Sequence, residues 1–311
     1  MSCPSVIVTT STNVISVCVF PVRGVAAIAA GRPPDHERPG TPPARARDRG
    51  THQAQVRSGH VRAQAILLPG GVMPADLAYG DLIAELSDDA EAIAKDLEVY
   101  TGPEPPSGYT LEHEIEGVLR TAREASFDRF HLLGYSAGGA SSLAFAASHP
   151  DRLLSLALIE PAWMGNDGLS PEEQAVWREF DRIATLPPRE MMMEFVAAQL
   201  APGVEPPPPP PPPPPPWMAT RPAGLRAFIE TFKSSTLDLD RLRSFDRPVY
   251  FALGGRSNPH FYARMADRAR EIFPDLDVEV FAERHHFDPP HRTEPEHTAR
   301  ALIAHWSRAE G

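Results

Sequence analysis

A serine between two glycines carries the clearest chemical signal in this sequence. Gly134-Tyr135-Ser136-Ala137-Gly138 fits the pattern G-x-S-x-G, with an apolar run at 130–133 before it and small residues suited to a helix, 140–148, after it. A serine on a sharp strand-to-helix turn needs neighbours without a Cβ, because the chain approaches itself closely on both sides. The turn also places the hydroxyl at a helix N-terminus, where developing negative charge is stabilised. These features favour Ser136 as a nucleophile over a serine in a plain turn.

A serine hydroxyl is a weak nucleophile until a base accepts its proton, so the chemistry also needs a histidine and a group that orients it. Twelve histidines are present. Three of them, His285, His286 and His291, lie in the loop between a predicted strand at 276–281 and a predicted final helix that runs to residue 306. From their position alone, any of the three could be the base.

The elements that must position these residues alternate between strands and helices from residue 62 onward, as in a parallel α/β sheet. Apolar runs predict strands at 63–68, 97–100, 130–133, 153–159, 249–253 and 276–281. Helical patterning is present at 79–93, 110–125 and 140–148. The alternation stops at 163–245, where helices are expected at 171–184, 189–200 and 223–233. The sequence therefore predicts a core formed by 62–162 and 246–311, with a helical insertion between the two parts.

Over most of residues 62–311 the chain resembles the α/β-hydrolase family. The resemblance rests on the G-x-S-x-G elbow, the Pro69-Gly70-Gly71 turn after the first strand and the segment around His286. It implies an α/β-hydrolase fold, with a mostly parallel central sheet flanked by helices and an inserted helical cap at 163–245. It also implies a serine hydrolase that cleaves an ester-like small molecule through an acyl-enzyme. A perhydrolase or carbon–carbon bond hydrolase, and a non-catalytic binding protein of the same fold, are the alternatives.

The family resemblance also selects a base and an acid. His286, followed by a phenylalanine, resembles the family's His-apolar pair ahead of the final helix, with His285 and His291 as alternatives. The loop after 249–253, the usual place of the acid, contains no carboxylate. A known family variation places the acid at the end of the strand after the elbow, where this chain has Glu160. We therefore expect a Ser136, His286 and Glu160 triad.

The same resemblance points to backbone N–H groups that would stabilise an oxyanion. In the family, one donor follows the nucleophile and the other follows the turn after the first strand, which gives Ala137 and Gly71 here. Pro69 stands where the family often has histidine, and this departure leaves Val72 as an alternative to Gly71. No metal or organic cofactor is expected for this chemistry.

Composition and charge exclude several other classes of protein. The chain has 311 residues and a formal net charge of -11. Residues 1–65 contain eight arginines and three acids and are therefore basic, so the remainder of the chain is strongly acidic. An acidic body disfavours nucleic-acid binding and suits a small-molecule substrate. Both cysteines lie in the first 20 residues, which excludes a disulfide framework for the body. No apolar stretch is long enough to predict a membrane span, and the sequence gives no indication of oligomeric state.

Two low-complexity segments remain. Residues 1–61 form a leader with a possible β-hairpin at 6–20, followed by a segment rich in proline, glycine and arginine that is expected to be disordered. We expect a cytoplasmic protein; a secretory signal in 1–30 is the weaker alternative, because no basic residue precedes Arg23. Eleven consecutive prolines at 206–216 predict a polyproline II rod, about 34 Å if straight, that acts as a spacer within the cap.

Overall fold

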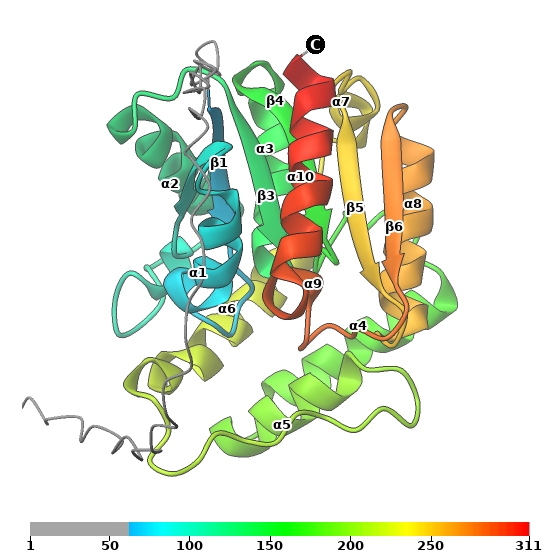
Figure 1. Cartoon of the computed structure of the whole chain (residues 1–311). Coiled ribbons are helices and arrows are strands. Elements are labelled where there is room, and N and C mark those ends of the chain that lie inside the picture. The colour runs from blue at the N-terminus through cyan, green and yellow to red at the C-terminus, as the bar shows by residue number, and fades with distance from the viewer. Residues whose placement is uncertain (1–61, 311) are drawn as a thin grey trace, which may run out of the picture. The chain divides into compact units, whose positions relative to one another are not determined.

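The computed structural model describes residues 62–310, which form a six-stranded sheet with helices on both faces (Figure 1). The strands are β1 (Ala63–Leu68), β2 (Ala90–Ala94), β3 (Phe130–Tyr135), β4 (Leu153–Ile159), β5 (Val249–Gly254) and β6 (Leu276–Phe281). Their order is β2-β1-β3-β4-β5-β6, and every neighbouring pair is parallel. Because both faces of such a sheet are covered, its central strands β3 and β4 consist mainly of buried apolar residues. The predicted α/β-hydrolase fold is confirmed.

Each face of the sheet has its own layer of helices and its own hydrophobic cluster. One layer contains α1 (Ala75–Leu86), α9 (Pro290–Thr293) and α10 (Pro295–Glu310). The other contains α2 (Leu111–Glu124), α3 (Ala137–Ser148), α7 (Leu239–Arg243) and α8 (Arg264–Ile272). Short 3-10 turns η1 (Glu98–Tyr100) and η2 (Pro150–Arg152) and a π-helical turn η4 (Pro259–Ala263) connect these elements.

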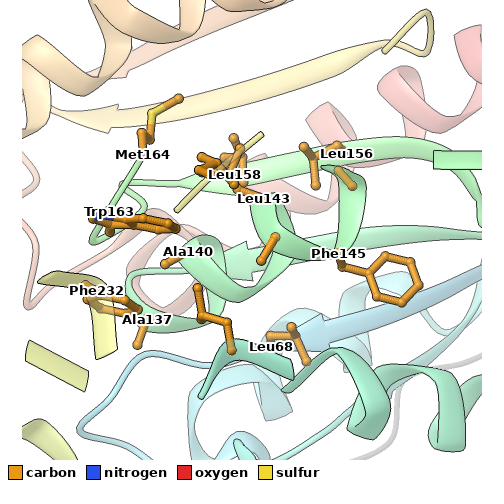
Figure 2. Close-up of a cluster of buried hydrophobic side chains, with 14 of the residues drawn as sticks. Leu68, Ala137, Ala140, Leu143, Phe145, Leu156, Leu158, Trp163, Met164 and Phe232 are labelled. Carbon is orange, nitrogen blue, oxygen red and sulfur yellow. The ribbon is translucent and has the colours of Figure 1, made fainter. Parts of the chain in front are cut away.

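Helix α3 lies at the centre of the larger cluster and is almost entirely buried. Its alanines, glycines and serines let it lie close to the sheet, and Figure 2 shows Leu143 among the apolar side chains of the neighbouring strands. At the end nearest the elbow, the rings of Trp163 and Phe232 stack with centroids 5.8 Å apart. The turn that carries Ser136 is therefore built on a rigid, close-packed support.

Of the helices between β4 and β5, α7 packs against α3 and α8, and the others lie beyond the carboxyl ends of the strands, at the bottom of Figure 1. They are α4 (Pro171–Ala184), α5 (Pro188–Ala198), η3 (Pro216–Thr220) and α6 (Arg221–Ser234). Helix α4 begins with a capping box, in which Ser170 Oγ accepts from the Glu173 N–H and Glu173 Oε2 accepts from the Ser170 N–H. The other oxygen of Glu173 accepts from Arg268 Nε at 3.0 Å, which ties α4 to α8. We call residues 163–245 the helical insertion.

The proline run forms neither helix nor strand between residues 206 and 215, and its side chains are largely exposed. The chain bends at Pro212 and Pro213, so the run is not straight over its whole length. The last proline, Pro216, already belongs to η3.

Two predictions at the β1 side of the sheet are wrong. The helix expected at 79–93 ends at Leu86, and its last part forms the edge strand β2. The strand expected at 97–100 is the 3-10 turn η1. The alanine-rich edge strand β2 has the local pattern of a helix, and the short apolar turn η1 has the local pattern of a strand. Only pairing with the rest of the fold distinguishes the true elements from the predicted ones.

Several predictions concern residues outside 62–310. The hairpin, the disordered segment and the signal sequence proposed for the leader all lie outside the described residues. Within the described part, no helix is both long and apolar enough to cross a membrane.

Candidate active site

Ser136 lies on the turn between β3 and α3, with its backbone at φ 54° and ψ -118°. The flanking glycines have a steric reason, because a Cβ on Gly134 would collide with the backbone of Gly138 and a Cβ on Gly138 would collide with the carbonyls of Leu68 and Pro69. The close approach also lets the Gly138 N–H donate to Pro69 O at 3.0 Å. The turn therefore fixes the serine tightly against the end of β1.

The imidazole of His286 lies beside this serine, although the two residues are 150 positions apart. Its Nε2 is 3.0 Å from Ser136 Oγ, and both side chains are largely buried. The phenol of Tyr135 donates to the His286 carbonyl, and the ring of Tyr262 stacks on the imidazole with centroids 4.4 Å apart and planes 16° apart. These contacts hold the imidazole on the side of the hydroxyl.

Glu160 contacts the other nitrogen of the same imidazole. Its Oε2 is 3.0 Å from His286 Nδ1, and its Oε1 accepts from the Gly254 N–H at 2.8 Å. The residue is 2% exposed and has φ 42°, a left-handed conformation at the end of β4 that turns its side chain toward β5. A buried carboxylate in this position sets the tautomer of the imidazole, with Nδ1–H donating to Glu160 and Nε2 free to accept from Ser136.

The alternative residues are held elsewhere. Nδ1 of His285 lies 3.0 Å from Asp288 Oδ1, and the same carboxylate accepts from the His285 N–H. His291 is fully buried between the rings of Tyr79 and Tyr135, and burial lowers its pKa to about 3. Of the three histidines in this loop, only His286 has a hydrogen-bond contact with Ser136.

The expected oxyanion donors border the same cavity as the serine. Ala137 is the first residue of α3, so its N–H has no acceptor within the helix. Gly71 and Val72 both line the cavity from the loop after β1, so the choice between them stays open. A Cβ on Gly71 would lie 3.0 Å from Leu225 Cδ2 on α6, so a larger residue would fit here only if the leucine side chain shifted.

The cavity over Ser136 is small and apolar. It has a volume of about 40 Å³, enough for a few water molecules. Aromatic rings from the helical insertion and the following turn form most of its wall: Trp177, Phe180, Phe195, Phe228, Phe232 and Phe261. None of the described lining residues is Asp, Glu, Lys or Arg, and the amide of Gln199 is already hydrogen-bonded to Tyr262 and to the Phe195 carbonyl.

Within residues 62–310, no group of three or more His, Cys, Asp or Glu side chains is arranged to hold a metal ion.

The sequence reasoning did not identify the residues that contact the proposed triad without belonging to it. Tyr262 lies in a π-helical turn, a feature often found at functional sites, but nothing in its local sequence marks it.

An elbow serine, an imidazole and a carboxylate thus meet at the carboxyl ends of parallel strands. The sequence also matches a family model. Residues 66–204 match the model for the alpha/beta hydrolase fold. The matched stretch resembles the α/β-hydrolase family, and the chain has the fold of that family. A solved thermophilic esterase from Thermogutta terrifontis has the same fold, with a TM-score of 0.59 at 19% identity over 80% of this chain and 91% of that one.

Two curated relatives match shorter stretches. A fluoroacetate dehalogenase from Burkholderia is 31% identical over 81 residues, 24% of this chain and 27% of that protein. A pimeloyl-[acyl-carrier protein] methyl ester esterase from Aeromonas hydrophila is 29% identical over 134 residues, 42% of this chain and 51% of that protein. The chain thus spans about half or less of the length of these relatives.

Proposed function

We propose that this protein of α/β-hydrolase fold is a serine hydrolase that cleaves small esters through a Ser136, His286 and Glu160 triad. The observation that carries the proposal is the pair of 3.0 Å contacts that joins the imidazole to the hydroxyl on one side and to the carboxylate on the other. The missing acid after β5 is the best argument for a non-catalytic protein. It loses its force because Glu160, at the end of the neighbouring strand, reaches the last residue of β5, Gly254.

The proposed reaction has two halves. Ser136 Oγ attacks the ester carbonyl carbon while His286 Nε2 takes the hydroxyl proton, and the N–H groups of Ala137 and of Gly71 or Val72 stabilise the oxyanion. Collapse of this intermediate breaks the bond to the alkoxide, which leaves with the proton from Nε2, and an acyl-serine remains. Water then attacks the acyl carbon, gives its proton to His286, and the acid departs as Ser136 regains its proton.

We further propose that the helical insertion acts as a cap that selects short, uncharged substrates. Its aromatic side chains form an apolar wall, and a carboxylate-bearing substrate would bring its charge into a cavity with no cation to pair with it among the described lining residues. This argues against transferring the dehalogenase activity named for the relative, because fluoroacetate is an anion. The elbow residue, a serine, also differs from the aspartate that the dehalogenase branch has at this position.

Labelling with a fluorophosphonate probe tests the nucleophile. Modification is expected at Ser136 and should be absent in Ser136→Ala. In the same variant, kcat for p-nitrophenyl acetate should fall at least about 10³-fold. The chain offers a matched control in a second serine that contacts a histidine. Ser155 Oγ lies 2.8 Å from His131 Nδ1, and Glu310 Oε1 lies 3.2 Å from His131 Nε2. Because Ser155 is wholly buried, the probe should leave it unlabelled. A wild-type protein that stays unlabelled at Ser136 would overturn the proposal.

A pair of esters tests the selection against charge. The value of kcat/KM for mono-p-nitrophenyl succinate should be at least about 100-fold lower than for p-nitrophenyl butyrate, since an unpaired buried carboxylate costs several kcal/mol. Similar values for the two esters would contradict the assignment of an uncharged substrate.

A further inference from the structure

The loop that contains the proposed oxyanion donor has no strand or helix of its own to hold it. Residues 70–72, here called the oxyanion loop, follow β1 and precede α1. Two side chains bond the carbonyls of this loop. The phenol of Tyr100 donates to Gly71 O, and Nε of Arg221 donates to Val72 O at 2.7 Å. Tyr100 belongs to η1 and Arg221 to α6, so core and insertion both hold the loop.

Arg221 is an unusual residue for this position. It is 3% exposed, and no carboxylate of the described residues lies within 4.0 Å of its guanidinium. Its Cζ instead lies 3.9 Å above the ring of Tyr100 and 5.3 Å from the ring of Trp217, and burial lowers its pKa. A buried cation is costly unless other groups satisfy it. Here these are ring faces, the Thr220 hydroxyl and a carbonyl of the oxyanion loop.

Tyr100 is fixed as firmly as Arg221. The buried carboxylate of Glu114 accepts from the N–H groups of Glu98 and Val99 at 2.9 and 3.2 Å, and this sets the turn η1. A Cβ on Gly224, one turn along α6 from Arg221, would collide with the ring of Tyr100. The turn, the insertion helix and the oxyanion loop therefore interlock.

We propose that Tyr100 and Arg221 are positioning residues for the oxyanion hole, so that α6 of the insertion takes part in assembling the catalytic site. This inference rests on the proposed function of Ser136. In a trans peptide the C=O and the next N–H lie in one plane and point in opposite directions. The Gly71 carbonyl shares its peptide with the Val72 N–H, and the Val72 carbonyl shares its peptide with the Met73 N–H. The two bonds therefore fix both peptides that flank Val72, and with them the direction of the Val72 N–H, one of the two candidate donors. Without these bonds the peptides can rotate, and the loop loses a preorganised donor.

Three variants test the inference: Arg221→Gln, Tyr100→Phe and the control Arg226→Gln. Arg226 lies on the same helix and also donates to backbone carbonyls, those of Ala184 and Leu186, but these are not part of the oxyanion loop. We expect Arg221→Gln to lower kcat for p-nitrophenyl acetate about 10- to 100-fold with less than about a threefold change in KM. Tyr100→Phe should lower kcat about fivefold, and Arg226→Gln less than about twofold.

Inhibitor binding separates positioning from general loosening. A trifluoromethyl ketone forms a tetrahedral adduct with an oxyanion, whereas the matching methyl ketone binds mainly without one. The affinity for the trifluoromethyl ketone should fall in Arg221→Gln by about the same factor as kcat, and the affinity for the methyl ketone should not change. Equal losses for both ketones, or values of kcat equal to those of Arg226→Gln, would overturn the inference.

The remaining outcomes are also decisive. If Arg221→Gln does not fold, Tyr100→Phe decides, because it keeps the ring under Arg221 and removes only the hydroxyl; unchanged kcat in this variant overturns the inference. A wild-type protein without labelling at Ser136 overturns the proposed function and this inference with it. Normal labelling of the wild type with undiminished kcat in both variants overturns the inference alone.

Discussion

Two of the three residues proposed as the triad have left-handed backbone. Ser136 and Glu160 have φ values of 54° and 42°, and among the described non-glycine residues only Ser126 shares this feature. Such a conformation costs about 1–3 kcal/mol and persists only where the surroundings enforce it. At Ser136 the N–H donates to Ile159 O at 3.0 Å, and the carbonyl accepts from the Ala162 N–H at 2.9 Å. Strain held in this way at two residues that meet the same imidazole supports a functional role for both.

Replacing Glu160 by glutamine tests the acid. We expect kcat to fall about 10²- to 10⁴-fold, because an amide –NH₂ facing Nδ1 favours the tautomer in which Nε2 carries the proton and cannot accept from Ser136. The amide oxygen can still accept from the Gly254 N–H, so the melting temperature should change little. Steady-state kinetics with p-nitrophenyl acetate and thermal denaturation measure the two effects.

Asp288→Asn is the matched control for the acid. Asp288 is close to His286 in sequence but contacts His285 instead, so this variant should keep most of its activity. Near-wild-type turnover in a folded Glu160→Gln protein, or a larger loss in Asp288→Asn, would show that the acid is misassigned.

At the scale of elements, the strand order brings the site together. The order reverses between β1 and β3, and in open parallel sheets ligands bind outside the carboxyl ends of the strands at this point. The oxyanion loop follows β1, Ser136 follows β3 and Glu160 follows β4, so all three meet at one edge. His286 arrives at the same edge from the loop after β6. The topology thus converts four distant segments into one constellation.

A glycine comparison tests how closely α3 must approach β1. Gly138→Ala should lower the free energy of unfolding by more than about 2 kcal/mol, because the new methyl group would overlap the carbonyls of Leu68 and Pro69. Gly80→Ala is the control: Gly80 lies in α1, a Cβ there would meet nothing within 4 Å, and the variant should gain about 0.5–1 kcal/mol. Urea denaturation of both variants measures the difference, and equal stabilities would contradict the steric argument.

The sequence predicts elements well where the pattern is strong. Helix α4 begins and ends where expected, because a capping box and an amphipathic pattern mark it, and β1 and β6 match their apolar runs. The errors at β2 and η1 occur where the local pattern is weak. Ala90–Ala94 is rich in a good helix former but gains more from pairing with β1 at the edge of the sheet.

The same contrast holds for the candidate site. G-x-S-x-G marks Ser136 directly, because the turn demands glycines at fixed positions. Tyr100 and Arg221 act through contacts between residues far apart in the chain, and no local pattern records such contacts. Long-range positioning of this kind can be read only from the folded molecule.

At the scale of the whole molecule, core and insertion share one hydrophobic cluster. It joins Leu143 and Leu158 of the core with Trp177 and Phe228 of the insertion. We therefore expect the two parts to unfold together. In Trp306→Phe the remaining tryptophans all lie in the insertion, so fluorescence reports on it while far-UV circular dichroism reports on the whole chain. The two urea transitions should coincide; an earlier fluorescence transition would indicate an independently unfolding insertion.

The response of the whole fold to acid depends on histidines buried without charge. Burial lowers the pKa of His291 and of His305 to about 3, and neither ring nitrogen of His291 has a hydrogen-bond partner among the described residues. Because an unfolded histidine titrates near pH 6.5, the unfolded chain binds protons that the folded chain does not bind between about pH 6.5 and pH 3. The free energy of unfolding must therefore fall as the pH falls from about 6.5 to 3. Above about pH 6.5 these two histidines do not make it depend on pH.

His291→Phe isolates this effect, since a phenyl ring can pack between Tyr79 and Tyr135 without a buried polar atom. At pH 7 we expect its stability to lie within about 1 kcal/mol of the wild type, and at about pH 4.5 to exceed it by about 2 kcal/mol. Urea denaturation at a series of pH values measures the divergence. His260→Phe, at an exposed position, is the control for replacing a histidine by phenylalanine. Parallel curves for all three proteins would mean that His291 is protonated in the folded state, so that its burial does not link folding to pH.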